Sequence, residues 1–182
     1  AFRPSDLLFQ VLVMSAIGMI LVPLLTKEHH RGDKEGIANL LGASMGLGCL
    51  VFGGLAIAIA LALPTIAPYL VDFQGEQLRL YINFARIVLI SDLLMVIGNT
   101  AGQELVRIER YWVYGLTPVI YSLGTIAGTL FLTPWIGPYG PIAGTAAGSL
   151  LYAVWRLLAV SWSGIPLRLR LWHTAIADMG WM

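Results

Sequence analysis

Five long apolar stretches, separated by short polar segments, dominate the chain. They extend over about residues 6–26, 37–63, 78–102, 113–135 and 140–162. A helix needs about twenty apolar residues to cross the hydrocarbon core of a bilayer, so each stretch is long enough to span a membrane. Prolines favour a helix end at Pro23 in the first stretch, and at Pro64 and Pro68 after the second. The pattern predicts an all-α membrane protein with five transmembrane helices.

The two ends of the chain have different patterns. The opening AFRPSDLLFQ has no initial Met, no basic region and no small-residue cleavage site, so it is not a secretory signal. We therefore expect the chain to begin mid-protein, after a preceding helix. Near the other end Leu and Arg alternate, and helical amphipathicity follows, which is typical of an interfacial segment or a linker. The expected organisation is a transmembrane bundle over residues 1–163 and an amphipathic tail over 164–182.

Glycines recur at four-residue spacing on four of the spans. Residues four apart share a helix face. In lipid little hydrophobic force acts between helices, so association relies on small residues that let backbones approach. One pair could arise by chance, because glycine is common in membrane helices, but four together indicate a bundle packed through glycines. The expected packing positions are Gly42, Gly46, Gly98, Gly102, Gly124, Gly128, Gly140, Gly144 and Gly148.

Composition supports the membrane assignment and excludes several classes of protein. Of the 182 residues 58% are hydrophobic and 12% charged, whereas a soluble domain is about a quarter charged. A net charge of +1 without a basic stripe argues against nucleic-acid binding. The single cysteine, Cys49, excludes an internal disulfide.

No motif for catalysis or metal binding is present. The sequence has no phosphate loop, Ser/His/Asp arrangement, paired-His motif or dinucleotide fingerprint. His29 and His30 lie in a charged loop without the fixed geometry that a metal needs, so we interpret them as solvated. We expect no enzyme, no catalytic residue, no metal site and no cofactor.

Positive charges gather in alternate loops. The basic residues of loops 27–36 and 103–111 and of the tail fall on one side of the bundle if five spans alternate in direction. The positive-inside rule places these two loops and the C-terminus in the cytoplasm, and the N-terminus outside. Arg156, late in the fifth span, is expected to reach the cytoplasmic interface.

Two ionisable residues, Arg86 and Asp92, lie inside the third span. Each costs about 2.5 to 3.5 kcal/mol on insertion scales, which makes both functional candidates. Asp92 shares a helix face with Asn99 and Gln103, and this polar face could line a water-filled cavity. Arg86 groups instead with Asn83 and Arg79. The alternative is that Arg86 reaches to the interface and that Asp92 only bonds a neighbouring helix.

Three stretches resemble a known family. AFRPSDLLFQVLV, followed by VPLLTKEHHRGDKEG, is similar to the second helix and first cytoplasmic loop of the MurJ (MviN) lipid II flippases, of the multidrug/oligosaccharidyl-lipid/polysaccharide exporter superfamily. The segment PTIAPYLV resembles the end of their third helix. The segment from Arg110 to Leu151 resembles their fifth and sixth helices through Arg110, Tyr111, Pro118, Tyr121, Gly124, Gly128 and the Pro-x-x-Gly-x-x-Gly turn from Pro134 to Gly140.

The resemblance implies that the five spans are helices two to six of an N-terminal lobe. It implies two six-helix lobes in a V, alternating access, and export of a lipid-linked peptidoglycan precursor across the bacterial cytoplasmic (inner) membrane. In such flippases cavity arginines hold the diphosphate. This chain departs from that pattern: Phe9 follows the paired leucines where some members carry an arginine, Met14 and Ser15 replace an acidic residue and a glycine, and Asp92 replaces an apolar residue.

Two functions remain open from the sequence. The first is part of a lipid II flippase, with cavity candidates Arg3, Asp92, Asn99 and Gln103 and cytoplasmic gate candidates Arg107 and Arg110. Its expected partners are membrane lipids, the lipid-linked precursor, and a second lobe or other transmembrane chains. The alternative is a non-transporting structural or assembly subunit, derived from a flippase half-lobe, whose glycine ridges pack against other membrane proteins, lipids or pigments.

Overall fold

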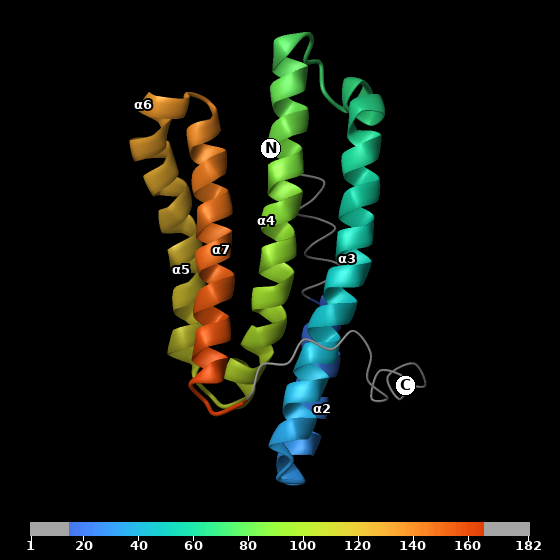
Figure 1. Cartoon of the computed structure of the whole chain (residues 1–182), viewed down its shortest axis with the longest axis vertical. Helices are drawn as coiled ribbons and strands as arrows, with labels where there is room; N and C mark the ends of the chain where they lie inside the picture. The colour runs from blue at the N-terminus through green and yellow to red at the C-terminus, as the bar shows by residue number, and fades with distance from the viewer. Residues whose placement is uncertain (1–14, 166–182) are drawn as a thin grey trace.

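The computed structural model describes residues 15–165, and all regular structure in that range is helical. The elements are α2 (Ser15–His30), α3 (Lys34–Leu70), α4 (Glu76–Arg107), α5 (Tyr111–Ala127), the π-helical turn η2 (Gly128–Leu132), α6 (Thr133–Ile136) and α7 (Tyr139–Ser161). They form an elongated bundle whose helices run along the long axis (Figure 1). The all-α prediction is confirmed. Arg3 and nearly all of the predicted tail lie outside the described residues.

Four helices in the described range are long and apolar enough to cross a membrane: Lys34–Leu70, Glu76–Arg107, Tyr111–Ile136 and Tyr139–Ser161. The third combines α5, η2 and α6 into one rod. These four correspond to the last four predicted spans. The first predicted span is described only from Ser15, where α2 begins.

The turns at one end of the bundle are shorter than predicted. Only residues 31–33 separate α2 from α3, and only 108–110 separate α4 from α5. Lys, Glu and Arg are good helix formers, and an apolar pattern marks only the part of a helix that meets lipid. The Asp33 carboxylate caps α3 by accepting a hydrogen bond from the Gly36 backbone N–H at 2.8 Å. In the second turn Glu109 has a left-handed backbone, with φ of 59°.

The prediction that Pro64 and Pro68 end the second span was wrong, because α3 continues through both to Leu70. A proline lacks the backbone N–H that would bond the carbonyl four residues earlier. Membrane helices tolerate this where a neighbouring helix supplies another donor. For Pro64 that carbonyl belongs to Ala60, and it accepts hydrogen bonds from Nε and Nη2 of Arg86, on α4, at 3.4 and 3.3 Å.

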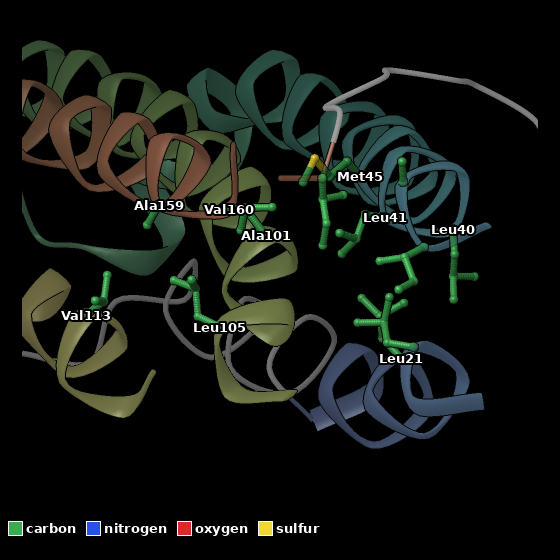
Figure 2. Close-up of a cluster of buried hydrophobic side chains, with 13 residues drawn as sticks. Leu21, Leu40, Leu41, Met45, Ala101, Leu105, Val113, Ala159 and Val160 are labelled. Carbon is green, nitrogen blue, oxygen red and sulfur yellow. The ribbon is translucent and has the colours of Figure 1, made fainter. Parts of the chain in front are cut away.

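The largest apolar core lies at the end of the bundle that carries the turns 31–33 and 108–110. Five helices contribute to it, and α4 passes between the α2–α3 pair and the α5–α7 pair (Figures 1 and 2). Its buried members are Leu21, Leu25, Ile37, Ala38, Leu40, Leu41, Met45, Ala101, Leu105, Val113, Ala159, Val160 and Ile165. Burying such side chains against one another fixes this end of the molecule.

Glycines bring the α5–η2 rod and α7 into close backbone contact. A Cβ added at Gly124 would lie 2.5 Å from the Gly148 Cα, and one added at Gly144 would lie 2.6 Å from the Gly128 Cα. A Cβ added at Gly140 would meet the Thr133 backbone N at 2.5 Å. Gly42 and Gly46 are buried in α3. Along α7 the glycine faces therefore touch backbone directly, the arrangement that small residues permit in lipid.

Candidate functional site

A buried arginine connects three helices in the interior of the bundle. Arg156, on α7, is 1% exposed, although a charged side chain is rarely fully buried. Its Nε donates to Thr117 Oγ1 at 3.0 Å, and its Nη1 donates to Asn99 Oδ1 at 2.6 Å. Longer bonds of 3.4 Å run from Nη1 to the Gly98 carbonyl and from Nη2 to the Tyr114 carbonyl. One guanidinium thus binds α4 and α5 to α7.

Two aromatic rings enclose the same guanidinium. Its Cζ lies 4.1 Å from the ring centroid of Tyr114 and 4.3 Å from that of Tyr152, distances typical of cation–π contacts. The Tyr152 hydroxyl also donates to Asn99 Oδ1 at 2.5 Å. These partners are uncharged, so ring faces and oxygen dipoles replace the water that the cation loses on burial.

Two of the predicted packing glycines make room for this cluster. A Cβ at Gly102 would lie 2.6 Å from Arg156 Nη1, and a Cβ at Gly98 would lie 2.8 Å from Tyr152 Cε1. The Gly98–Gly102 face therefore receives mainly two side chains of α7, whereas the Gly124–Gly128 face receives backbone.

The prediction that Arg156 reaches the interface was wrong. Its position near the end of an apolar span favoured an exposed head group, but its side chain lies on the face of α7 that packs into the bundle. One sequence signal could have indicated this. Tyr152 and Arg156 are four residues apart, and so are Gly98 and Gly102. Two bulky side chains on one helix can therefore pack over two glycines on the next.

The structure places the predicted cavity residues of α4 on a face that points into the bundle. Asp92 is 6% exposed and Asn99 is 4% exposed, the latter within the Arg156 cluster. Gln103 is half-buried, and its Nε2 donates to the Asn99 carbonyl at 3.4 Å. Contact between these residues and a substrate stays a prediction.

The two predicted gate arginines lie near the turn between α4 and α5. Arg107 pairs with Glu104 of the same helix, through a bond of 2.7 Å from Nε to Oε2 and a second contact from Nη2 to Oε1. Glu104 is fully buried, so Arg107 neutralises a carboxylate inside the protein. Arg110 is exposed at the residue that precedes α5. The gate role of both stays a prediction.

A second polar face of α4 is exposed. Arg79, Asn83 and Arg86 share one helix face toward the end that carries the turns 71–75 and 137–138, and all three are exposed. Asn83 Nδ2 donates to the Tyr139 hydroxyl of α7 at 3.4 Å, and Arg86 donates to Ala60 of α3. We call Arg79, Asn83 and Arg86 the α4 stripe.

The same face of α4 is covered in its other half. There it carries Ile97 and Ala101, which pack into the apolar core together with residues of α2. Among residues 15–165 the α4 stripe is therefore the exposed half of a face that lies between α3 and α7.

Comparison with protein-family models matches residues 1–179 of the chain to a family described as "Lipid II flippase MurJ". The match covers the predicted spans and almost all of the tail. Comparison with curated proteins finds no match.

Proposed function

Because this chain belongs to the lipid II flippase MurJ family, we propose that its helices form part of a transporter lobe that moves a lipid-linked peptidoglycan precursor across the bacterial cytoplasmic membrane. The family match over residues 1–179 is the observation that carries the proposal. Four apolar helices long enough to cross a membrane support it. Membrane lipids and the lipid-linked substrate are the partners that the family implies.

The proposed orientation puts the turns 31–33 and 108–110 in the cytoplasm and the turns 71–75 and 137–138 outside. Support comes from the geometry: the first two turns lie at one end of the bundle, and the other two lie at the opposite end (Figure 1). The first end also carries Lys27, Arg31 and Lys34, as the positive-inside rule requires.

We assign the α4 stripe to the path that the substrate follows. An arginine inside a membrane span is costly unless it faces protein, water or an anionic partner, and Arg79 and Arg86 are exposed. Guanidinium donors bind phosphate groups strongly, often through two parallel hydrogen bonds. The cavity role of Asp92, Asn99 and Gln103 would require movement at the buried side of α4, because Asn99 is held by Arg156.

Movement of the lobe would carry α4, α5 and α7 as one unit. Arg156 links all three, and glycines hold the α5–η2 rod against α7. Transporters with repeated halves move such bundles as rigid bodies around a fixed site. The proposed mechanism is therefore rocking of this unit, with the α4 stripe on the moving surface.

Complementation of a flippase-depleted bacterial strain tests the proposal. The native gene should restore growth, and failure at a normal membrane level would refute the function. We expect the double change Arg79→Gln with Asn83→Ala to lower growth sharply while the protein stays at its normal level in the membrane. Lys27→Gln, an exposed charge at the other end of the bundle, is the control and should complement fully. Full complementation by the double variant would remove the α4 stripe from the path.

Asp92→Leu separates the two faces of α4 in the same assay. Loss of growth with a stable protein supports a role for the Asp92 carboxylate in transport. Unchanged growth would remove Asp92 from the mechanism and leave the α4 stripe as the candidate.

A further inference from the structure

The outer end of α3 contains a backbone acceptor whose helical donor is missing. In an α-helix the N–H of residue 64 would bond the carbonyl of residue 60, but residue 64 is proline. A carbonyl without a partner costs several kcal/mol in hydrocarbon, where no water can replace the bond. The Arg86 guanidinium fills this gap from the neighbouring helix, at 3.4 Å from Nε and 3.3 Å from Nη2.

The contact also stabilises the charge of Arg86 itself. Arg86 is ten residues from the start of α4, about 15 Å along the helix, and its charge lies inside the predicted span. An arginine at this depth in a membrane is stabilised by backbone carbonyls as well as by anions. The bond therefore removes two penalties together, one on each helix.

In the part of the chain that the structure describes, the segment of α3 beyond Pro64 is mostly exposed. Among residues 64–70 only Ala67 is buried, while Ile66, Tyr69 and Leu70 are 47%, 89% and 56% exposed. A second proline, Pro68, removes another backbone donor from the same segment. Among the described residues this last part of α3 buries little side-chain surface, and just beyond it the Phe73 ring contacts the Tyr81 ring of α4. A segment with so little burial depends strongly on each bond that holds it.

We propose that Arg86 is a positioning residue that latches the outer end of α3 onto α4 by replacing the backbone donor that Pro64 lacks. The latch is a conformational device: when the bond is made, residues 64–70 continue α3 beside α4, and when it is broken, this segment bends away at Pro64. The proposal is independent of what the protein transports.

Hydrogen–deuterium exchange of the native protein in lipid nanodiscs tests the latch. In Arg86→Leu we expect the amides of residues 65–71 to exchange on the order of tenfold faster, as loss of one charged hydrogen bond implies. In a Pro64→Ala background the Ala N–H bonds Ala60, so Arg86→Leu should change exchange there by less than about twofold. Equal effects in the two backgrounds, or no effect in either, would overturn the proposal.

Arg79→Leu is the matched control. It removes the same charge from the same helix face, and among the described residues the Arg79 side chain makes no hydrogen bond to α3, so exchange of residues 65–71 should not change. If Arg79→Leu speeds exchange of residues 65–71 as much as Arg86→Leu does, the positive charge of this face, and not the bond to Ala60, holds the end of α3.

The double variant also covers the case in which Arg86→Leu does not accumulate. Pro64→Ala with Arg86→Leu leaves no unsatisfied carbonyl and should accumulate in the membrane at the level of Pro64→Ala alone. If adding Pro64→Ala does not restore the membrane level of Arg86→Leu, the latch is refuted.

Discussion

Arg156 shows how a single charged residue can organise a membrane bundle. Its guanidinium serves oxygen acceptors on two helices, and its faces meet Tyr114 and Tyr152. Removing it would take away one donor from several buried acceptors, although Asn99 Oδ1 would keep the Tyr152 hydroxyl and the Tyr114 carbonyl would keep the Thr117 hydroxyl. Each lost bond of this kind costs about 1–3 kcal/mol where it leaves a buried polar group less well satisfied.

We expect Arg156→Gln to lower the free energy of unfolding by about 2–4 kcal/mol. Arg156→Lys should lower the free energy of unfolding by less, because the ammonium keeps the charge and hydrogen-bond donors. Some loss should remain, because an ammonium cannot form the planar fork or stack between two rings. Thermal unfolding of the detergent-solubilised protein measures both. Arg79→Gln, an exposed arginine, is the control, and a midpoint for Arg156→Gln equal to that of the control would contradict a structural role.

The sequence indicated which residues are polar within the spans but not which ones meet. Asn99 and Arg156 are 57 positions apart, and no helical periodicity relates them. Their contact depends on the packing of α4 against α7, which lets Gly98 and Gly102 receive Tyr152 and Arg156. Sequence patterns could thus predict the face of α4 but not its occupant.

At the scale of the helix, glycine faces have two different uses. The α5–η2 rod and α7 meet backbone to backbone through Gly124, Gly128, Gly144 and Gly148, and a hydrogen bond of 3.2 Å between the hydroxyls of Thr125 and Thr145 lies beside them. On α4 the same spacing forms recesses for side chains. Four-residue spacing predicts a close approach in both cases, but only the facing residues decide what approaches.

Gly128→Ala should destabilise the protein by about 1–3 kcal/mol, because its Cβ would collide with the Gly144 backbone, which cannot rotate away. Gly144→Leu should disrupt the helix pair altogether. Gly115→Ala, on α5, is the matched control: nothing lies within 4 Å of an added Cβ, so the change should be neutral or stabilise the helix by about 0.5–1 kcal/mol. Resistance to unfolding in mild detergent reports all three, and equal effects of Gly128→Ala and Gly115→Ala would contradict the close contact.

Helix ends show where local rules stop being sufficient. Pro64 and Pro68 are strong terminators when only local sequence is considered, yet α3 continues through both. At Pro64 the carbonyl that lacks a helical donor accepts hydrogen bonds from Arg86 of another helix. The apolar pattern located the four described spans, since it reflects the lipid around them. It could not locate their ends, since these depend on contacts between helices.

For the whole molecule, the proposed orientation predicts which turns reagents can reach. In a Cys49→Ala background, Gln74→Cys in the turn between α3 and α4 should react with a membrane-impermeant maleimide added to spheroplasts. Arg31→Cys in the turn between α2 and α3 should react only after the membrane is opened. Both native side chains are exposed, so accessibility reports the side of the membrane and not burial. The reverse pattern would invert the topology.

The exposed side chains of α3 predict the height at which the protein sits in the bilayer. Its 37 residues measure about 55 Å, against a hydrocarbon thickness of about 30 Å. Large exposed apolar side chains on α3 begin only at Leu47 and continue to Leu70, a run of roughly 36 Å. Before Leu47 in the sequence, the apolar side chains of α3 pack against α2 in the core near the turns 31–33 and 108–110 (Figure 2). We therefore predict that the membrane surface crosses α3 near Leu47 and that the first three turns of α3 lie outside the hydrocarbon core.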